Sequence, residues 1–77
     1  MPSAERVVMG RQHALMAAAA LDALGPRAAA VFRRHRIDTI PQRTLAEEFG
    51  VSLSTIESDL RRAYRALLAV KERIDED

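Results

Sequence analysis

Residues 41–60 read PQRTLAEEFGVSLSTIESDL, and their apolar spacing predicts two short helices that meet at a tight corner. Leu45 and Phe49 are four residues apart, so they share one face of the first helix. Ile56 and Leu60 are also four residues apart and repeat the pattern on the second helix. Gly50 lies between them, and glycine ends a helix in the left-handed conformation without a steric penalty. Together these features predict a helix-turn-helix.

The residues on either side of this stretch also favour helix over strand, because the chain is 48% hydrophobic, only 4% aromatic, and rich in Ala and Leu. Gly25-Pro26 marks a boundary, since glycine closes one helix and proline opens the next at a position that needs no N–H donor. We therefore expect an all-α fold, a small four-helix domain with long first and last helices. The expected helices span about 4–24, 27–36, 41–49 and 53–73, with Ser52 as the cap of the last.

A chain of 77 residues without cysteine forms one small domain that no disulfide can staple. We expect a helical linker in residues 1–25, the helix-turn-helix domain in 26–74 and an acidic tail in 75–77. The longest apolar run, residues 14–21, is far shorter than the roughly 20 residues that a membrane helix requires. No signal peptide is evident, so the chain is expected to be soluble and cytoplasmic.

Basic charge is concentrated in the middle of the chain, although the net charge of the whole is only +1. Residues 26–65 contain eight arginines and five acidic residues, whereas residues 66–77 contain two basic and four acidic residues. Arginine suits phosphate and guanine, because its planar guanidinium donates two parallel hydrogen bonds. This distribution favours a nucleic-acid partner for the helix-turn-helix.

The second helix of the motif has a polar side opposite its apolar side. With Ile56 placed toward the core and about 100° per residue, hydroxyl and arginine side chains fall on the outer side. The residues expected on or beside this ridge are Ser54, Thr55, Ser58, Arg61, Arg62 and Arg65. Short polar side chains near a helix start, with longer cations further along, suit entry into the major groove of DNA. In the alternative interpretation this side is only solvated, and Arg61 pairs with Glu57 four residues earlier. Arg62 would likewise pair with Asp59 on the other flank.

Two further arginines are expected to contact phosphates, because the start of a helix exposes N–H groups and partial positive charge. Arg43 stands at the start of the third expected helix, and Arg27 at the start of the second. Glu57 could accept a hydrogen bond from a cytosine amino group. The chain has no glycine-rich phosphate loop and no nucleophile motif, and His13 and His35 lack metal-ligand spacing. We therefore expect no catalytic residue, no metal site and no cofactor.

An ordered series of short motifs runs through residues 21–68. Its elements are Leu24-Gly25-Pro26-Arg27, residues 31–36, Pro41-Gln42, Leu45-Ala46, Phe49-Gly50-Val51-Ser52, Thr55-Ile56-Glu57, Leu60 and Arg62-Ala63. In this order they resemble region 4, the C-terminal domain, of bacterial sigma factors. The likeness is strongest to the extracytoplasmic-function (ECF) group of the ferric-citrate-regulator type. Ser58-Asp59 differs from that group, whose members often carry basic residues there.

The resemblance implies a four-helix unit that places its last helix in the major groove of the −35 promoter element during transcription initiation. The residues that would face DNA are Leu53, Ser54, Thr55, Glu57, Ser58, Arg61 and Arg62, with Arg27, Gln42 and Arg43 supporting the DNA backbone. It also implies docking on the β flap of RNA polymerase and control by an anti-sigma factor. An apolar groove around Ala28, Val31, Phe32, Leu45 and Phe49 would partly serve the polymerase.

A heptad-like seam of apolar residues continues beyond the motif. Its members are Leu53, Ile56, Leu60, Ala63, Leu67, Val70 and Ile74. We expect a core stripe that packs on the first two helices, with a homodimer through the long helices as the alternative. Two other functions stay open at this point. One is a helical module that docks on polymerase or an anti-sigma factor with little DNA binding, and the other is the DNA-binding domain of a response regulator.

Overall fold

Four helices follow one another in residues 4–76, the part of the chain that the computed structural model describes. They are α1 (Ala4–Asp22), α2 (Pro26–Arg36), α3 (Gln42–Phe49) and α4 (Leu53–Glu76), and no strand occurs in this range. Side chains are described for residues 10–75. The prediction of a small all-α domain with long first and last helices is confirmed, and α4 runs to Glu76 instead of ending near Arg73. None of these helices, over the described residues, is long and apolar enough to cross a lipid bilayer.

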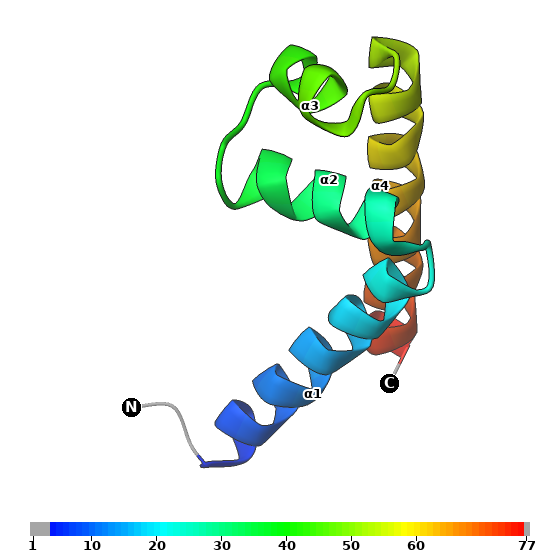
Figure 1. The fold of residues 1–77 in the computed structure, drawn as a ribbon. Helices are drawn as coiled ribbons and strands as arrows, with labels where there is room; N and C mark the ends of the chain where they lie inside the picture. The colour runs from blue at the N-terminus through cyan, green and yellow to red at the C-terminus, as the bar shows by residue number, and fades with distance from the viewer. Residues whose placement is uncertain (1–3, 77) are drawn as a thin grey trace.

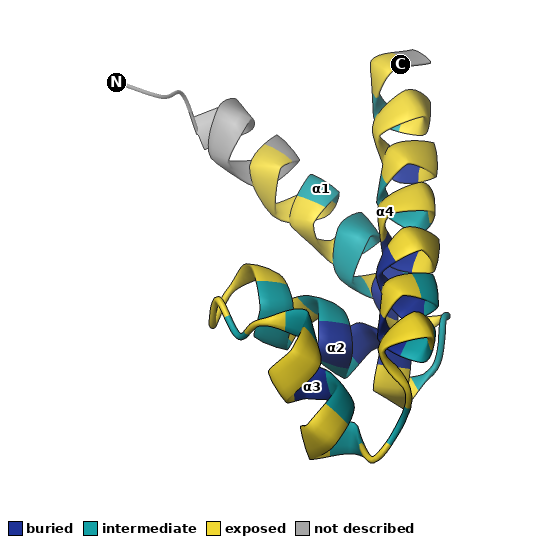
Figure 2. Cartoon of the chain, turned by 90° about the horizontal axis from the view of Figure 1, so that it is seen from above, coloured by how far each residue is buried: buried dark blue, intermediate teal, exposed yellow. Residues whose placement is uncertain are grey.

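The long helix α4 is the axis of the molecule, and the other three helices pack along one of its sides (Figure 1). Helices α2 and α3 lie beside its N-terminal half, and the corner between α1 and α2 meets it further along. A helix of 24 residues spans about 36 Å at about 1.5 Å per residue, which accounts for most of the longest dimension, 44 Å. Most of α4 that is visible in Figure 2 is exposed, with buried and intermediate segments between the exposed ones.

One buried cluster closes the helix-turn-helix. Val31 of α2, Leu45 of α3 and Ile56 of α4 are each 0% exposed. Leu60 completes the cluster from the next turn of α4. Half-buried apolar residues surround it, namely Phe32, Ile40, Ala46, Phe49 and Val51. The apolar pairs four residues apart therefore face inward on both helices, as their spacing predicts.

A second buried cluster joins α1 to α2 and α4. It consists of Leu21, Ala29 and Ala63, and Leu24, Phe32 and Leu67 pack against it. Two of its three members are alanines, whose short side chains allow α2 and α4 to lie close together where they cross. Phe32 packs against both clusters and so connects the helix-turn-helix to the corner between α1 and α2.

The corners between helices have the backbone conformations that their glycines predict. Gly50 is left-handed, with φ 65° and ψ 36°. The N–H of the following residue, Val51, donates to the carbonyl of Ala46 at 3.0 Å, which completes the usual glycine-ended helix terminus. Gly25 has φ 103° and ψ 161° immediately before Pro26, which begins α2. Both predicted helix boundaries are confirmed.

The apolar seam of α4 is used within the chain along its middle. Ile56, Ala63 and Val70 are all buried, so this part of the seam is a core stripe, as expected. Leu53 differs, since it is 37% exposed at the first residue of the helix. Beyond the corner with α2, α1 runs away from α4 at an angle (Figures 1 and 2), and Leu15 on α1 is 64% exposed.

The apolar groove that the family resemblance implies for polymerase docking is not open. Ala28 is 3% exposed, and both Val31 and Leu45 are 0% exposed. Phe32 and Phe49 are half-buried around them. The expectation of a groove at these residues is wrong, because the same side chains form the buried contacts between α2, α3 and α4.

Candidate nucleic-acid interface

The N-terminal half of α4 presents polar side chains on the side away from the core. Ile56 and Leu60 are buried on its inner side. The predicted DNA-facing residues of α4 that are exposed are Leu53, Ser54, Glu57, Arg61, Arg62 and Arg65. Thr55 and Ser58 are half-buried, so they add less to the surface than their position on the helix predicts. The outward ridge is therefore a strip of exposed arginines that begins with a serine.

Hydroxyl groups order the start of α4. The backbone N–H of Thr55 donates to Oγ of Ser52 at 3.2 Å, which confirms Ser52 as the cap. The same oxygen lies 2.9 Å from Oγ1 of Thr55 and 3.1 Å from Oγ of Ser54. Three hydroxyls are thus held together at a helix start, where the partial positive charge of the helix favours an anion.

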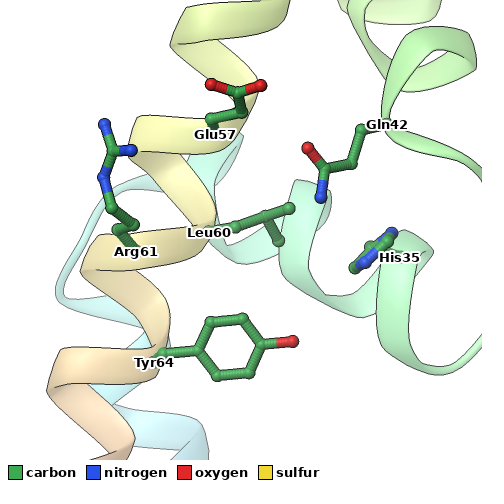
Figure 3. A pocket seen from close by; sticks show the side chains of 6 residues that line it. All are labelled: His35, Gln42, Glu57, Leu60, Arg61 and Tyr64. Atoms are coloured by element: carbon green, nitrogen blue, oxygen red, sulfur yellow. The ribbon is translucent and has the colours of Figure 1, made fainter.

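A groove separates α4 from the end of α2 and the start of α3 (Figure 3). Its volume is about 370 Å³, and its walls are His35, Gln42, Glu57, Leu60, Arg61 and Tyr64. Leu60 and Tyr64 reach from α4 toward α2, whereas Arg61 leaves α4 on its other side (Figure 3). The groove brings Gln42 of α3 to the same surface as Glu57 and Arg61 of α4. The structure therefore gathers three of the predicted DNA-facing residues from two separate helices.

Three arginines of the predicted interface pair with none of the described acidic side chains. Among the described side chains, Arg43, Arg61 and Arg65 form no salt bridge. The pair expected between Arg61 and Glu57 is not formed, although both side chains line the groove. An exposed guanidinium without a carboxylate partner can bind a phosphate without first breaking another contact.

Arg27 lies in a different environment from the one its sequence position predicts. Its Nε donates to Oδ2 of Asp59 at 2.8 Å, and its Nη2 donates to Oδ1 at 3.2 Å. Asp59 is 1% exposed, so the flank of α4 on which helix periodicity places it is buried. The hydrogen bond from Arg27 to Asp59, together with the carboxylate charge, raises the pKa of Arg27 above its ordinary value.

Arg62 belongs to the same group of charges. Its Nη1 lies 3.7 Å from Oδ1 of Asp59, which confirms the predicted contact between residues three apart. Its Nη2 also donates to the backbone carbonyl of Leu24 at 3.3 Å. Arg27 and Arg62 are therefore both held toward the protein, whereas Arg43, Arg61 and Arg65 are not held by any described acidic group.

Tyr64 is a groove residue that the sequence pattern did not single out. Its ring packs edge-to-face on Phe32, with centroids 5.7 Å apart and planes at 80°. The guanidinium carbon of Arg36 lies 6.0 Å from the centre of the same ring. Tyr64 is nevertheless 45% exposed. The available signal was its spacing from Glu57, which places both residues on one flank of α4.

Neither histidine belongs to a cluster of possible metal ligands among the described side chains. Nδ1 of His35 lies 3.0 Å from the backbone carbonyl of Ile40, so this ring is tied to the loop between α2 and α3. Within the described residues, no cluster of three or more His, Cys, Asp or Glu side chains is placed to hold a metal ion.

The family model described as "Sigma-70, region 4" matches residues 14–67, which is more than half of the chain. No curated protein and no solved structure gives a significant match. The matched span covers the end of α1, all of α2 and α3, and α4 as far as Leu67. It contains every residue of the predicted interface and agrees with the resemblance carried by residues 21–68. The match therefore selects this family over the response-regulator alternative.

Proposed function

Because the chain belongs to the sigma-70 region 4 family, a family of DNA-binding domains of sigma factors, we propose that α4 enters the major groove of the −35 promoter element. The observation that carries this proposal is the exposed strip that starts at Ser54 and continues through Arg61 and Arg65. Buried Ile56 and Leu60 hold that strip outward from the opposite side of the same helix. A rigid helix that presents cations in this way fits the major groove of B-form DNA.

The proposed contacts divide by side-chain length. Ser54 and Thr55 are short, so the start of α4 can approach the base edges closely. Ser58 follows one turn later but is half-buried, which favours a contact to the DNA backbone over one to a base. Leu53 is partly exposed at the tip of the helix and can contact a thymine methyl group.

Longer side chains extend the proposed interface on either side of α4. Arg61 reaches guanine or phosphate, and Arg65 reaches phosphate one turn further along. Glu57 has no ion pair among the described side chains, which leaves its carboxylate available to a cytosine amino group. Gln42 and Arg43 contact the sugar-phosphate backbone of the DNA strand that lies next to the start of α3. Arg27 and Arg62 receive no direct contact in this proposal, because Asp59 engages both.

We also propose that the domain docks on the β flap of RNA polymerase, as is general in the family. Exposed apolar residues after the end of α2 and along α4 support docking. Tyr64 and Leu68 lie one turn apart on α4 and are 45% and 54% exposed, and Ile37 after α2 is 73% exposed. These residues take the place of the expected apolar groove, which is closed. An anti-sigma factor and a second copy of the chain are the other partners that we propose.

The finer assignments rest on the sequence resemblance. We propose an ECF sigma factor of the ferric-citrate-regulator type that acts in the cytoplasm without a cofactor. Residues 26–74 would form the promoter-binding unit, with residues 1–25 as a helical linker and 75–77 as an acidic tail.

Salt-dependent binding to duplex DNA tests the main proposal. We expect Arg61→Ala and Arg43→Ala each to make the negative slope of log K against log salt less steep, by about 0.9 for every phosphate that the arginine no longer neutralises. Arg73→Ala is the matched control, because Arg73 is an exposed arginine near the far end of the same helix. The binding constants come from fluorescence anisotropy, and circular dichroism checks that each variant is folded. If the two interface variants behave like Arg73→Ala, the assignment of α4 is wrong.

The second candidate function is a protein-docking module with little DNA binding. Ser58-Asp59 stands where relatives often carry basic residues, and the carboxylate of Asp59 engages two of the arginines nearby. Tight binding to the isolated β flap, together with no detectable duplex binding at low salt, would favour this alternative.

A further inference from the structure

Asp59 is a buried charge on a helix whose opposite side is exposed. It is 1% exposed, and among the residues whose side chains are described it is the one polar or charged residue that is buried. It lies on α4 between Ser58 and Leu60, within the stretch that carries the proposed DNA contacts. A carboxylate is stable in such a place only if it is paired and hydrogen-bonded.

The carboxylate has two arginine partners from different helices. Arg27 at the first turn of α2 donates to both of its oxygens, at 2.8 and 3.2 Å. Arg62 on α4 lies 3.7 Å away and donates in addition to the carbonyl of Leu24, which follows α1. No buried side-chain polar atom in the described residues lacks a hydrogen-bond partner. The cluster of Arg27, Asp59 and Arg62 therefore ties α4 to the corner between α1 and α2.

Both arginines stay close to solvent. Each side chain is 49% exposed, so the guanidinium groups lie at the edge of the protein with their donors turned toward Asp59. Arg62 directly follows Arg61 of the proposed interface. Without the carboxylate, both side chains would be long, flexible cations beside a helix that approaches DNA.

We propose that Asp59 is a positioning residue of the DNA interface, which holds Arg27 and Arg62 away from phosphates and so limits the number of sequence-independent contacts. This inference rests on the proposed DNA-binding function. Contacts to phosphate supply most non-specific affinity, whereas contacts to base edges carry sequence information. Holding two cations against the protein therefore leaves the exposed strip of α4 with a larger share of the binding free energy.

The test compares two substitutions that remove the same charge. Asp59→Asn removes the counter-charge of Arg27 and Arg62. Asp22→Asn is the matched control, because Asp22 pairs with Arg33 at 3.0 Å on a surface outside the proposed interface. Binding of a mixed-sequence duplex is measured by anisotropy over a series of salt concentrations. We expect Asp59→Asn to steepen the salt slope by about 0.9 to 1.8, for one or two further phosphates neutralised, and Asp22→Asn to leave it unchanged.

A further measurement, on a variant that keeps Asp59, leaves the inference testable if Asp59→Asn does not fold. Arg62→Gln in the otherwise native chain is expected to leave the salt slope unchanged, because Arg62 does not contact phosphate there. Where Asp59→Asn does fold, the same change in that background is expected to remove the part of the added slope that Arg62 contributes. A purely structural role of Asp59 would alter stability without producing this pattern.

The outcomes separate this inference from the proposed function. If the native chain shows no duplex binding at low salt, the proposed function fails and the inference fails with it. If the native chain binds but Arg62→Gln or Arg27→Gln makes its salt slope less steep by about 0.9, only the inference is overturned. An unchanged slope in a folded Asp59→Asn variant overturns it as well.

Discussion

The three glycines occupy different backbone environments, and alanine at each should affect stability differently. Gly10 lies inside α1, Gly50 is left-handed with φ 65°, and Gly25 has φ 103° and ψ 161°. Among the described residues, a Cβ added at any of the three would meet no atom within 4 Å, apart from the residue's chain neighbours and, for Gly10, the backbone of its own helix. The effect of each substitution must therefore come from the backbone conformation and not from a steric clash with other residues.

The expected changes differ in sign and size. Gly50→Ala should lower the free energy of unfolding by about 1–2 kcal/mol, the penalty for a side chain in the left-handed region. Gly25→Ala should lower it by about 1–3 kcal/mol, since its conformation is essentially restricted to glycine. Gly10→Ala should instead raise it by about 0.5–1 kcal/mol, because alanine is the better residue inside a helix.

Asparagine distinguishes the two positive-φ positions. It tolerates the left-handed region, so Gly50→Asn should recover part of the stability that alanine removes. The conformation of Gly25 lies outside that region, so Gly25→Asn should recover little. Unfolding in urea, followed by far-UV circular dichroism, gives the free energies, and each kcal/mol should also shift the melting temperature by about 4–8 °C. A Gly25→Asn variant as stable as the native chain would refute this reasoning.

Three other substitutions test the packing, the cap and the surface. Leu45→Ala should lower the free energy of unfolding in urea by about 2–5 kcal/mol, because Leu45 is 0% exposed at the centre of the first cluster. Ser52→Ala should lower it by about 0.5–2 kcal/mol because it removes the acceptor of the hydrogen bond from the Thr55 N–H, and amide exchange should accelerate in the first turn of α4. Asp22→Asn should change the melting temperature little, because its pair with Arg33 is exposed and contributes less than about 1 kcal/mol; a large drop would show that this pair organises the corner.

The helix-turn-helix could be predicted because its determinants are local. Leu45 and Phe49 share a face through helix periodicity alone, and Gly50 closes the corner through its own backbone freedom. The outer side of α4 follows from the same periodicity once Ile56 is placed in the core. These predictions need no knowledge of which helix packs against which.

The contacts of the charged residues could not be predicted in the same way. Arg27 and Asp59 are 32 residues apart, so their pairing depends on how α2 crosses α4. A helical wheel places Asp59 on a flank, and only the neighbouring helix shows that this flank is covered. The pair between Arg61 and Glu57 has favourable spacing but does not form, as expected of surface pairs whose net gain is close to zero.

Phe32 packs against both buried clusters, and this shared side chain bears on how the molecule comes apart. If the two clusters shared no side chain, the half that contains the helix-turn-helix could unfold while the other half stayed folded. Because the Phe32 ring packs against both clusters, disrupting one cluster also removes contacts from the other. This coupling favours a single cooperative unfolding transition. Packing of α1 therefore stabilises the surface formed by α3 and the start of α4. It does so indirectly, because α1 and α3 make no contact in the described residues.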